Sequence, residues 1–91
     1  MRKRSIAVAG TMLIDRIREI GSLPARSELA RILRVFDSAG GCVPNTGIDL
    51  RRLDPELEVE ALGVVGADAD GEAILSALAK EGLRTDRVVR R

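Results

Sequence analysis

The stretch that most constrains the fold is residues 40–50, where two adjacent glycines precede a polar turn and a short amphipathic segment. Gly40 and Gly41 allow positive φ angles and a close approach of the backbone to a ligand, because neither has a Cβ. Pro44 fixes φ one residue before Asn45, whose side chain is predicted to cap a helix and offers both a donor and an acceptor. This corner suits a hydroxyl-bearing small molecule, and it equally suits a plain junction between a loop and a helix.

Length and composition predict one small globular domain. The chain has 91 residues, of which 45% are hydrophobic and 32% are charged. Its net charge of +1 creates no strong field for nucleic acid or an anionic membrane. Phe36 is the only aromatic residue, which argues against stacking on single-stranded bases, and no apolar run reaches membrane-spanning length. We therefore expect neither nucleic acid nor a membrane as a partner.

The use of histidine and cysteine restricts the chemistry further. The chain has no histidine, and Cys42 is its only cysteine. These counts exclude a histidine-based catalytic relay, a metal site built on histidines or paired cysteines, and an internal disulfide. The sequence therefore assigns no metal site and fits the reducing cytoplasm. Without a histidine to activate it, Cys42 is predicted to be a small packed thiol.

Apolar patterns along the chain predict an open α/β fold. The expected strands lie at 5–9, at 59–65 and from 85 onward, and the expected helices lie at 45–53 and 72–81. The first strand is a continuous apolar run, typical of a strand buried on both faces of a parallel sheet. Strand, helix, strand, helix, strand is the pattern of a parallel βαβ core. An insert separates Asp15, at the carboxyl end of the first strand, from Gly40.

Two carboxylates and one glycine delimit the second expected helix. Asp68 and Asp70 lack the further oxygen ligands of a calcium loop, so we expect Asp68 to form a turn and Asp70 to cap the helix. Gly82 is the expected C-cap.

The insert has an ambiguous pattern. Four of its apolar residues fall at helical spacing behind Ser27: Leu29, Ile32, Leu33 and Phe36. With Ser27 as the N-cap, local periodicity favours a helix over residues 27–38.

Three features together resemble the ribokinase-like, PfkB-type carbohydrate kinases. They are the strand-Gly10-x4-Asp15 opening, the Gly40-Gly41-x3-Asn45 corner and the Val65-Gly66-x-Asp68-x2-Gly71 segment. The Gly82-Leu83-Arg84-Thr85-Asp86 stretch also looks like the approach of this family to its next strand. The resemblance covers nearly the whole chain and depends on the order of the motifs.

This resemblance implies a transfer of the γ-phosphoryl group of ATP, with Mg²⁺, to a hydroxyl of a sugar, nucleoside or related alcohol. Asp15 would hydrogen-bond acceptor hydroxyls, and Gly40 and Gly41 would form the floor and hinge beneath the acceptor. Asn45 would bind another hydroxyl. No residue of the chain is assigned a catalytic role, an ATP contact or a metal.

The resemblance also implies that residues 16–39 form a small β lid over the acceptor. Residues 17–20 and 29–36 would then be strands, against the helical prediction for the second segment. Residues 1–15 and 40–91 would form the α/β core of one partial domain. Because the lid offers only Phe36 for stacking on a base, a sugar is the preferred acceptor over a nucleoside.

The sequence departs from the family in one respect. Family members are several times longer, and their Asp-Thr-x-Gly-Ala-Gly-Asp signature, which supplies the anion hole and the catalytic base, is missing here. We therefore expect a truncated, acceptor-binding N-terminal segment of a sugar kinase that is inactive alone. Its open sheet favours a homo-oligomer or pairing with a missing C-terminal half. The alternatives are a non-catalytic sugar-binding or regulatory α/β module and a purely structural domain.

Overall fold

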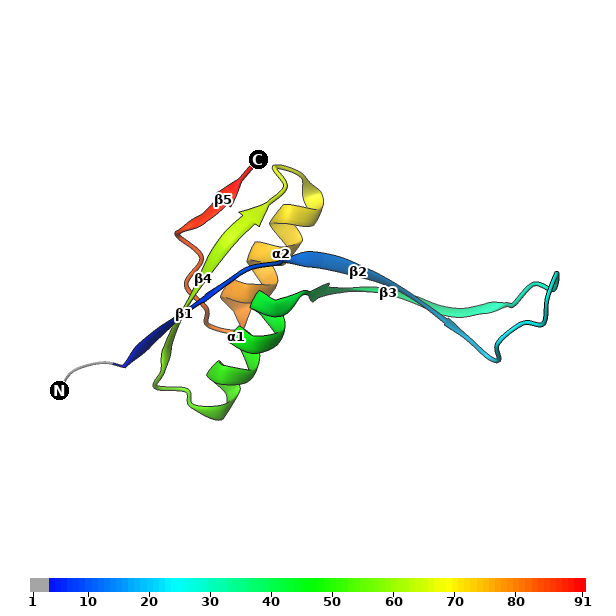
Figure 1. The fold of residues 1–91 in the computed structure, drawn as a ribbon, viewed down its shortest axis with the longest axis horizontal. Helices are drawn as coiled ribbons and strands as arrows, with labels where there is room; N and C mark the ends of the chain where they lie inside the picture. The colour runs from blue at the N-terminus through cyan, green and yellow to red at the C-terminus, as the bar shows by residue number, and fades with distance from the viewer. Residues whose placement is uncertain (1–3) are drawn as a thin grey trace.

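The computed structural model describes residues 4–91, which form an α/β body and a long projecting β-hairpin (Figure 1). The body contains β1 (Ser5–Ala9), α1 (Cys42–Leu53), β4 (Glu58–Val65), α2 (Ala69–Lys80) and β5 (Val88–Arg90). The hairpin contains β2 (Leu13–Ile20) and β3 (Ile32–Gly40). No helix among the described residues is long and apolar enough to cross a membrane.

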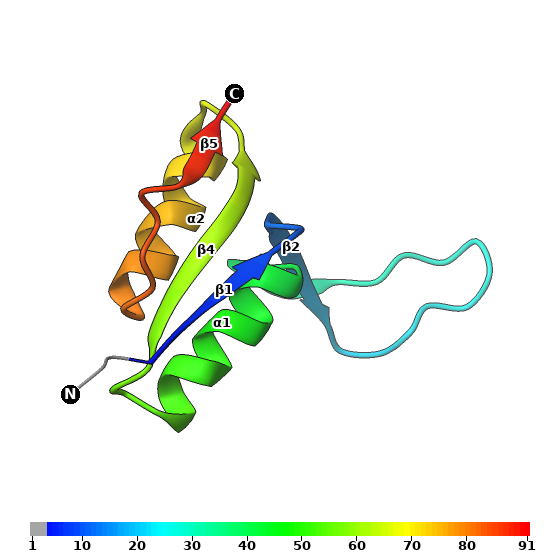
Figure 2. The same ribbon diagram turned by 60° about the vertical axis from the view of Figure 1, so that its left-hand side comes forward.

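The sheet of the body is parallel and has the strand order β1-β4-β5. β1 pairs with β4 from Ser5 opposite Glu58 to Ala9 opposite Leu62, and β5 continues the sheet on the other side of β4. Both connections advance in the same direction across the sheet, so right-handed crossovers place α1 and α2 on one face. Figures 1 and 2 show both helices on that side.

A small aliphatic core fills the space between this face and the helices. Its buried members are Met12, Val43, Val59, Ala61, Val65, Ile74, Leu78 and Leu83. Val59, Ala61 and Val65 alternate along β4, which brings all three side chains to the face that the helices cover. The opposite face is open: Val64 and its register partner Val89 are 54% and 47% exposed.

The prediction that residues 5–9 are buried on both faces is wrong. The segment is a strand, but only Val8 is half-buried, and Ile6 is 43% exposed. β1 lies at an edge of the described sheet, and α1 and α2 both lie on one side of it. A continuous apolar run therefore identified the strand, whereas the degree of burial depends on covering layers.

Both helices begin earlier than predicted, and their caps differ. α1 starts at Cys42 with Gly41 as its N-cap, so Asn45 lies inside the first turn and does not cap the helix. In α2 the N-cap is Asp68, whose Oδ1 accepts a hydrogen bond of 2.8 Å from the Gly71 amide. Asp70 lies two residues further along, as the second residue of the helix, which corrects its predicted role as the cap. Gly82 follows the C-cap residue of α2 with φ at 85°, the left-handed conformation typical of a helix end.

The insert forms an antiparallel hairpin and no helix. β2 and β3 pair from Leu13 opposite Gly40 to Ile20 opposite Ile32, with an irregularity after Glu19. The strand prediction for the insert is therefore confirmed from Ile32 onward, although residues 29–31 precede the strand. Cross-strand hydrogen bonding overrides the local helical spacing, because the apolar residues that a helix would bury have no core to pack against here.

Replacement of Leu78 by alanine should destabilise the body strongly. Leu78 is fully buried in α2, so we expect a loss of about 2 to 5 kcal/mol from the free energy of unfolding. Leu53→Ala is the matched control, because Leu53 is 83% exposed at the end of α1 and should change stability by less than about 0.5 kcal/mol. Urea denaturation of both variants measures the difference, and equal losses would contradict the described core.

Candidate functional site

The root of the hairpin brings the carboxyl end of β1 against the amino end of α1 (Figure 2). Gly10 follows β1 with φ at 143°, and Gly41 follows β3 with φ at 95°. A Cβ on Gly41 would lie 2.6 Å from the carbonyl oxygen of Thr11, which leaves no room for a side chain. The same Thr11 oxygen accepts a hydrogen bond of 3.1 Å from the amide of Val43. The start of α1 is therefore fixed against the chain that leaves β1.

Asp15 lies directly over Gly40. Asp15 is opposite Ser38 in the hairpin register, two residues from the pair formed by Leu13 and Gly40, so both pairs lie on the same face of the hairpin. A Cβ on Gly40 would overlap the carboxylate oxygen Oδ2 of Asp15, so this carboxylate rests against the bare α-carbon. The structure thus brings together two of the residues that the sequence assigned to one site.

Asn45 lies one helical turn beyond the glycines. Its backbone N–H donates a hydrogen bond of 3.1 Å to the carbonyl oxygen of Gly41, and its side chain is exposed in the first turn of α1. Among residues 4–91, no hydrogen bond joins the side chains of Asp15 and Asn45. Asp15 and Gly40 are in contact, whereas Asn45 is connected to them through Gly41 and the helix backbone. A shared ligand for these residues stays a prediction.

Cys42 is exposed, so its predicted burial as a packed thiol is wrong. As the first residue of α1, it places its sulfur beside the end of β1, away from the core. Its Sγ accepts a hydrogen bond of 3.2 Å from the amide of Thr11, and a Cβ on Gly10 would lie 2.5 Å from the same sulfur. Cys42 therefore occupies the corner itself.

Arg16 connects the hairpin to the body and was not identified from the sequence. Its guanidinium donates hydrogen bonds of 2.7 and 2.9 Å to the two carboxylate oxygens of Asp70, in the first turn of α2. The hydrogen bond to Asp70 raises the pKa of Arg16 above its ordinary value, so this side chain stays protonated. Both partners are about half exposed, and exposed pairs contribute only about 0 to 1 kcal/mol. No local pattern relates two residues that are 54 positions apart.

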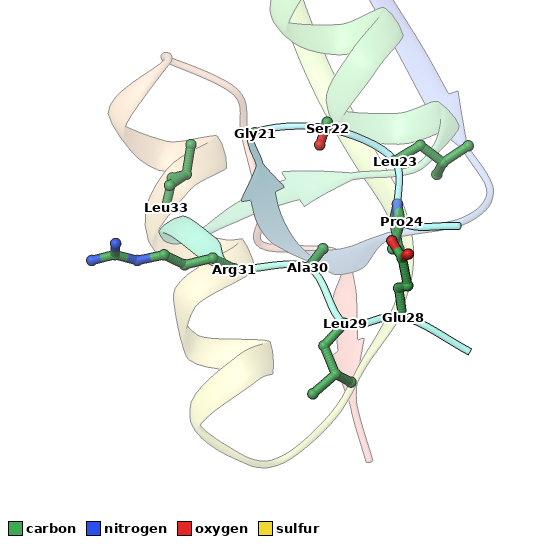
Figure 3. Close-up of a pocket in the computed structure, with 9 residues that line it drawn as sticks. All are labelled: Gly21, Ser22, Leu23, Pro24, Glu28, Leu29, Ala30, Arg31 and Leu33. Atoms are coloured by element: carbon green, nitrogen blue, oxygen red, sulfur yellow. The ribbon is translucent and has the colours of Figure 1, made fainter. Parts of the chain in front are cut away.

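Two hollows lie near the hairpin, at opposite ends of it. A groove of about 470 Å³ follows the carboxyl ends of β1 and β4 and is lined by residues 9–12 and 62–64. Ligands of open α/β sheets bind at such strand ends. The other hollow, of about 210 Å³, is formed by the tip of the hairpin around Pro24 and Leu29 (Figure 3). None of the predicted site residues Asp15, Gly40, Gly41 and Asn45 lines either hollow.

No metal centre is formed by the part of the chain that the structure describes. Within residues 4–91, no group of three or more His, Cys, Asp and Glu side chains is placed to hold a metal ion.

The motifs, the parallel sheet and the hairpin define a carbohydrate kinase fold. The chain matches the pfkB family carbohydrate kinase over residues 3–91, and it belongs to this family. The resemblance inferred from the ordered motifs is thus confirmed. No curated protein matches the chain significantly.

Solved structures share the arrangement. Fructokinase with bound ATP from Xylella fastidiosa is 27% identical, with a TM-score of 0.75 over 99% of this chain and 26% of that protein. An uncharacterized sugar kinase from Pyrococcus horikoshii in complex with ATP is 29% identical, with a TM-score of 0.74 over 93% of this chain and 26% of that protein. Ribokinase from Cryptococcus neoformans in complex with ADP is 23% identical, with a TM-score of 0.76 over 99% of this chain and 27% of that protein, and shows the fold alone.

The chain therefore spans about a quarter of the length of these structures. The predicted fold class is confirmed, because the parallel α/β body and the separate antiparallel hairpin match the N-terminal part of a ribokinase-like fold.

The two glycines of the corner should respond differently to a methyl group. In Gly41→Ala the new Cβ meets backbone and φ is 95°, so we expect a loss of about 1 to 3 kcal/mol of stability. In Gly40→Ala the atom that must move is the end of the Asp15 side chain, so the loss should stay below about 1 kcal/mol. Gly21→Ala is the control, since its Cβ would make only an ordinary contact of 3.6 Å with Leu33. Denaturation curves give the ranking, and a larger loss for Gly40→Ala than for Gly41→Ala would contradict the described corner.

Proposed function

We propose that this chain forms the acceptor-binding part of an ATP-dependent sugar kinase, which transfers a phosphoryl group to a hydroxyl of its substrate. The observation that carries the proposal is the carboxylate of Asp15 resting on Gly40, at the root of the hairpin. This places a hydrogen-bond acceptor beside a backbone surface that has no side chain. Membership of the carbohydrate kinase family supports a sugar as the ligand.

Each proposed residue has a separate role in holding the acceptor. Asp15 accepts hydrogen bonds from sugar hydroxyls, and the Asn45 amide donates to one hydroxyl oxygen or accepts from another. Gly40 and Gly41 form the floor of the corner in this proposal, because they let the Asp15 carboxylate and the Thr11 carbonyl pack directly on the backbone. A site built from such groups discriminates strongly, because an analogue that lacks a hydroxyl leaves the protein's own polar group unpaired.

The hairpin acts as a lid over this acceptor in the proposal. It leaves the body between Gly10 and Gly41, two glycines in the positive φ region that glycine adopts without strain. The Arg16–Asp70 ion pair supports the root of the hairpin against α2. Closure of such a lid excludes water, so that the phosphoryl group is transferred to the sugar and not hydrolysed.

The described residues do not fit a site for ATP and Mg²⁺. Lys80, the only lysine among residues 4–91, lies at the end of α2, and no carboxylate cluster is placed to hold a metal. No glycine-rich loop with a lysine precedes a helix in this chain. ATP and Mg²⁺ therefore enter the proposal only as requirements of the complete kinase, and no transfer step is assigned to these residues.

The presence of an acceptor corner without a nucleotide site also supports a second candidate. In it, the chain is a sugar-binding or regulatory module that binds the same ligand without phosphorylating it. In both cases, the exposed pair Val64 and Val89 on the open sheet face supports association with a second copy or with further kinase sequence.

Sugar binding should depend on the corner. Titration calorimetry with a panel of monosaccharides should detect a ligand for the wild-type chain. Asp15→Asn and Asn45→Ala should each weaken its binding about tenfold or more, because a hydroxyl loses its partner. Asp37→Asn is the matched control, since Asp37 lies on the opposite face of the hairpin. Equal losses in the control and in Asp15→Asn, or no binding to the wild-type chain, would contradict the proposal.

Phosphorylation should be absent from this chain alone. Incubation with ATP, Mg²⁺ and the same sugars should yield no sugar phosphate above the background without protein. No residue described here is assigned to bind the nucleotide or to act as the catalytic base. Coupled ADP detection measures the rate. Turnover that is abolished by Asp15→Asn would show that residues 4–91 also bind the nucleotide.

A further inference from the structure

The hairpin register separates two faces with different surroundings. Residues opposite one another in an antiparallel pair share a face, and successive residues alternate between faces. The face that carries Asp15, here called the acceptor face, carries four register pairs: Leu13 with Gly40, Asp15 with Ser38, Ile17 with Phe36, and Glu19 with Arg34. The other face carries Ile14, which packs against the core, and Arg16, which binds Asp70 of α2. The acceptor face is therefore the one not engaged by α2.

A cation is held on the acceptor face within two register pairs of Asp15. The guanidinium carbon of Arg34 lies 4.3 Å from the centre of the Phe36 ring. Phe36 belongs to the pair that lies between Arg34 and Asp15, so the guanidinium folds back toward the body. Successive pairs on one face are about 7 Å apart along a strand. Arg34 is two such steps from Asp15, about 14 Å along the strand, so a phosphate on the far side of a sugar bound to Asp15 would point toward the guanidinium.

Glu19 neutralises this cation. A guanidinium nitrogen of Arg34 donates a hydrogen bond of 2.8 Å to Oε1 of Glu19, its register partner. A planar guanidinium with free donors is a strong partner for phosphate and carboxylate groups. With one of its edges bound to Glu19, Arg34 offers an anion fewer donors and no net charge. Asp15 has no ion-pair partner within residues 4–91, so the remaining charge on the acceptor face repels an anion.

We propose that Glu19 is a specificity-determining residue that makes the acceptor site selective for neutral sugars over sugar phosphates. The inference rests on the proposed function, because it assigns a substrate class to the same site. Glu19 acts through Arg34, so it is a positioning residue that does not itself contact the sugar.

The test compares affinities for neutral and phosphorylated forms of one sugar. Titration calorimetry at low ionic strength measures the Kd values of D-fructose, D-fructose 6-phosphate, D-ribose and D-ribose 5-phosphate for the full chain. The wild-type chain should bind a neutral sugar at least about tenfold more tightly than its phosphate. Glu19→Gln should tighten binding of the phosphate by about threefold to tenfold, because it frees the Arg34 guanidinium at a half-exposed position. Binding of the neutral sugar should change by less than about twofold.

Three further measurements isolate the mechanism. Glu28→Gln removes the same charge from the hairpin tip, away from the ion pair, and should not alter the ratio of affinities. Adding Arg34→Gln to Glu19→Gln should abolish the gain, since the freed cation is lost. High salt should also abolish it, because exposed charges are screened. If Glu19→Gln fails to fold by circular dichroism, Glu19→Thr carries the same expectation.

The outcomes separate this inference from the proposed function. Wild-type binding of a sugar phosphate as tight as that of the neutral sugar overturns the selectivity and leaves the proposed function intact. An unchanged ratio in Glu19→Gln, with neutral sugar still bound, overturns the role of Glu19. Binding of none of the four compounds overturns the proposed function, and this inference with it.

Discussion

The close approach that Gly40 and Gly41 permit is the constraint on which the rest of the structure depends. A Cβ on Gly40 would overlap the carboxylate of Asp15, and one on Gly41 would lie 2.6 Å from the carbonyl oxygen of Thr11. Because both are absent, β3 can pass directly into α1 while packed against the chain that leaves β1. The point where the hairpin leaves the body and the start of α1 both depend on this one tight junction.

The hairpin contrasts with the body in how it is stabilised. The body buries its aliphatic side chains between one sheet face and two helices, whereas the hairpin extends into solvent from its root (Figure 1). Beyond Ile14, which packs against the core, the hairpin is held by strand pairing, by the exposed Arg16–Asp70 ion pair to α2 and by the Glu19–Arg34 ion pair between its own strands. Few buried contacts and many exposed hydrogen bonds are typical of segments that open at low cost in free energy. The hairpin is therefore held by fewer buried side chains than the body.

Local patterns predicted the helices and strands of the body well. They predicted poorly how far these elements are buried and which side chains they contact. Helical spacing before Gly82 and the aliphatic run that ends at Val65 identified α2 and β4, because each pattern reflects burial against a single neighbouring layer. The helix predicted in the insert was wrong, since helical spacing stabilises a helix only where a core receives its apolar side. Asp70 was expected to cap α2, but its carboxylate binds Arg16 while Asp68 caps the helix. Competition between local and distant partners cannot be judged from spacing.

The sequence by itself determined the family and the position of the glycine corner at residues 40 and 41. Motif order along the chain identified a carbohydrate kinase and located the glycine corner, and the structure shows that the backbone itself requires glycine at position 41. Only the tertiary structure decided which charges meet. Arg16 reaches Asp70 across 54 positions, and Arg34 lies opposite Glu19 because of the hairpin register. Such contacts depend on how strands pair and where they point in space, which one-dimensional spacing does not encode.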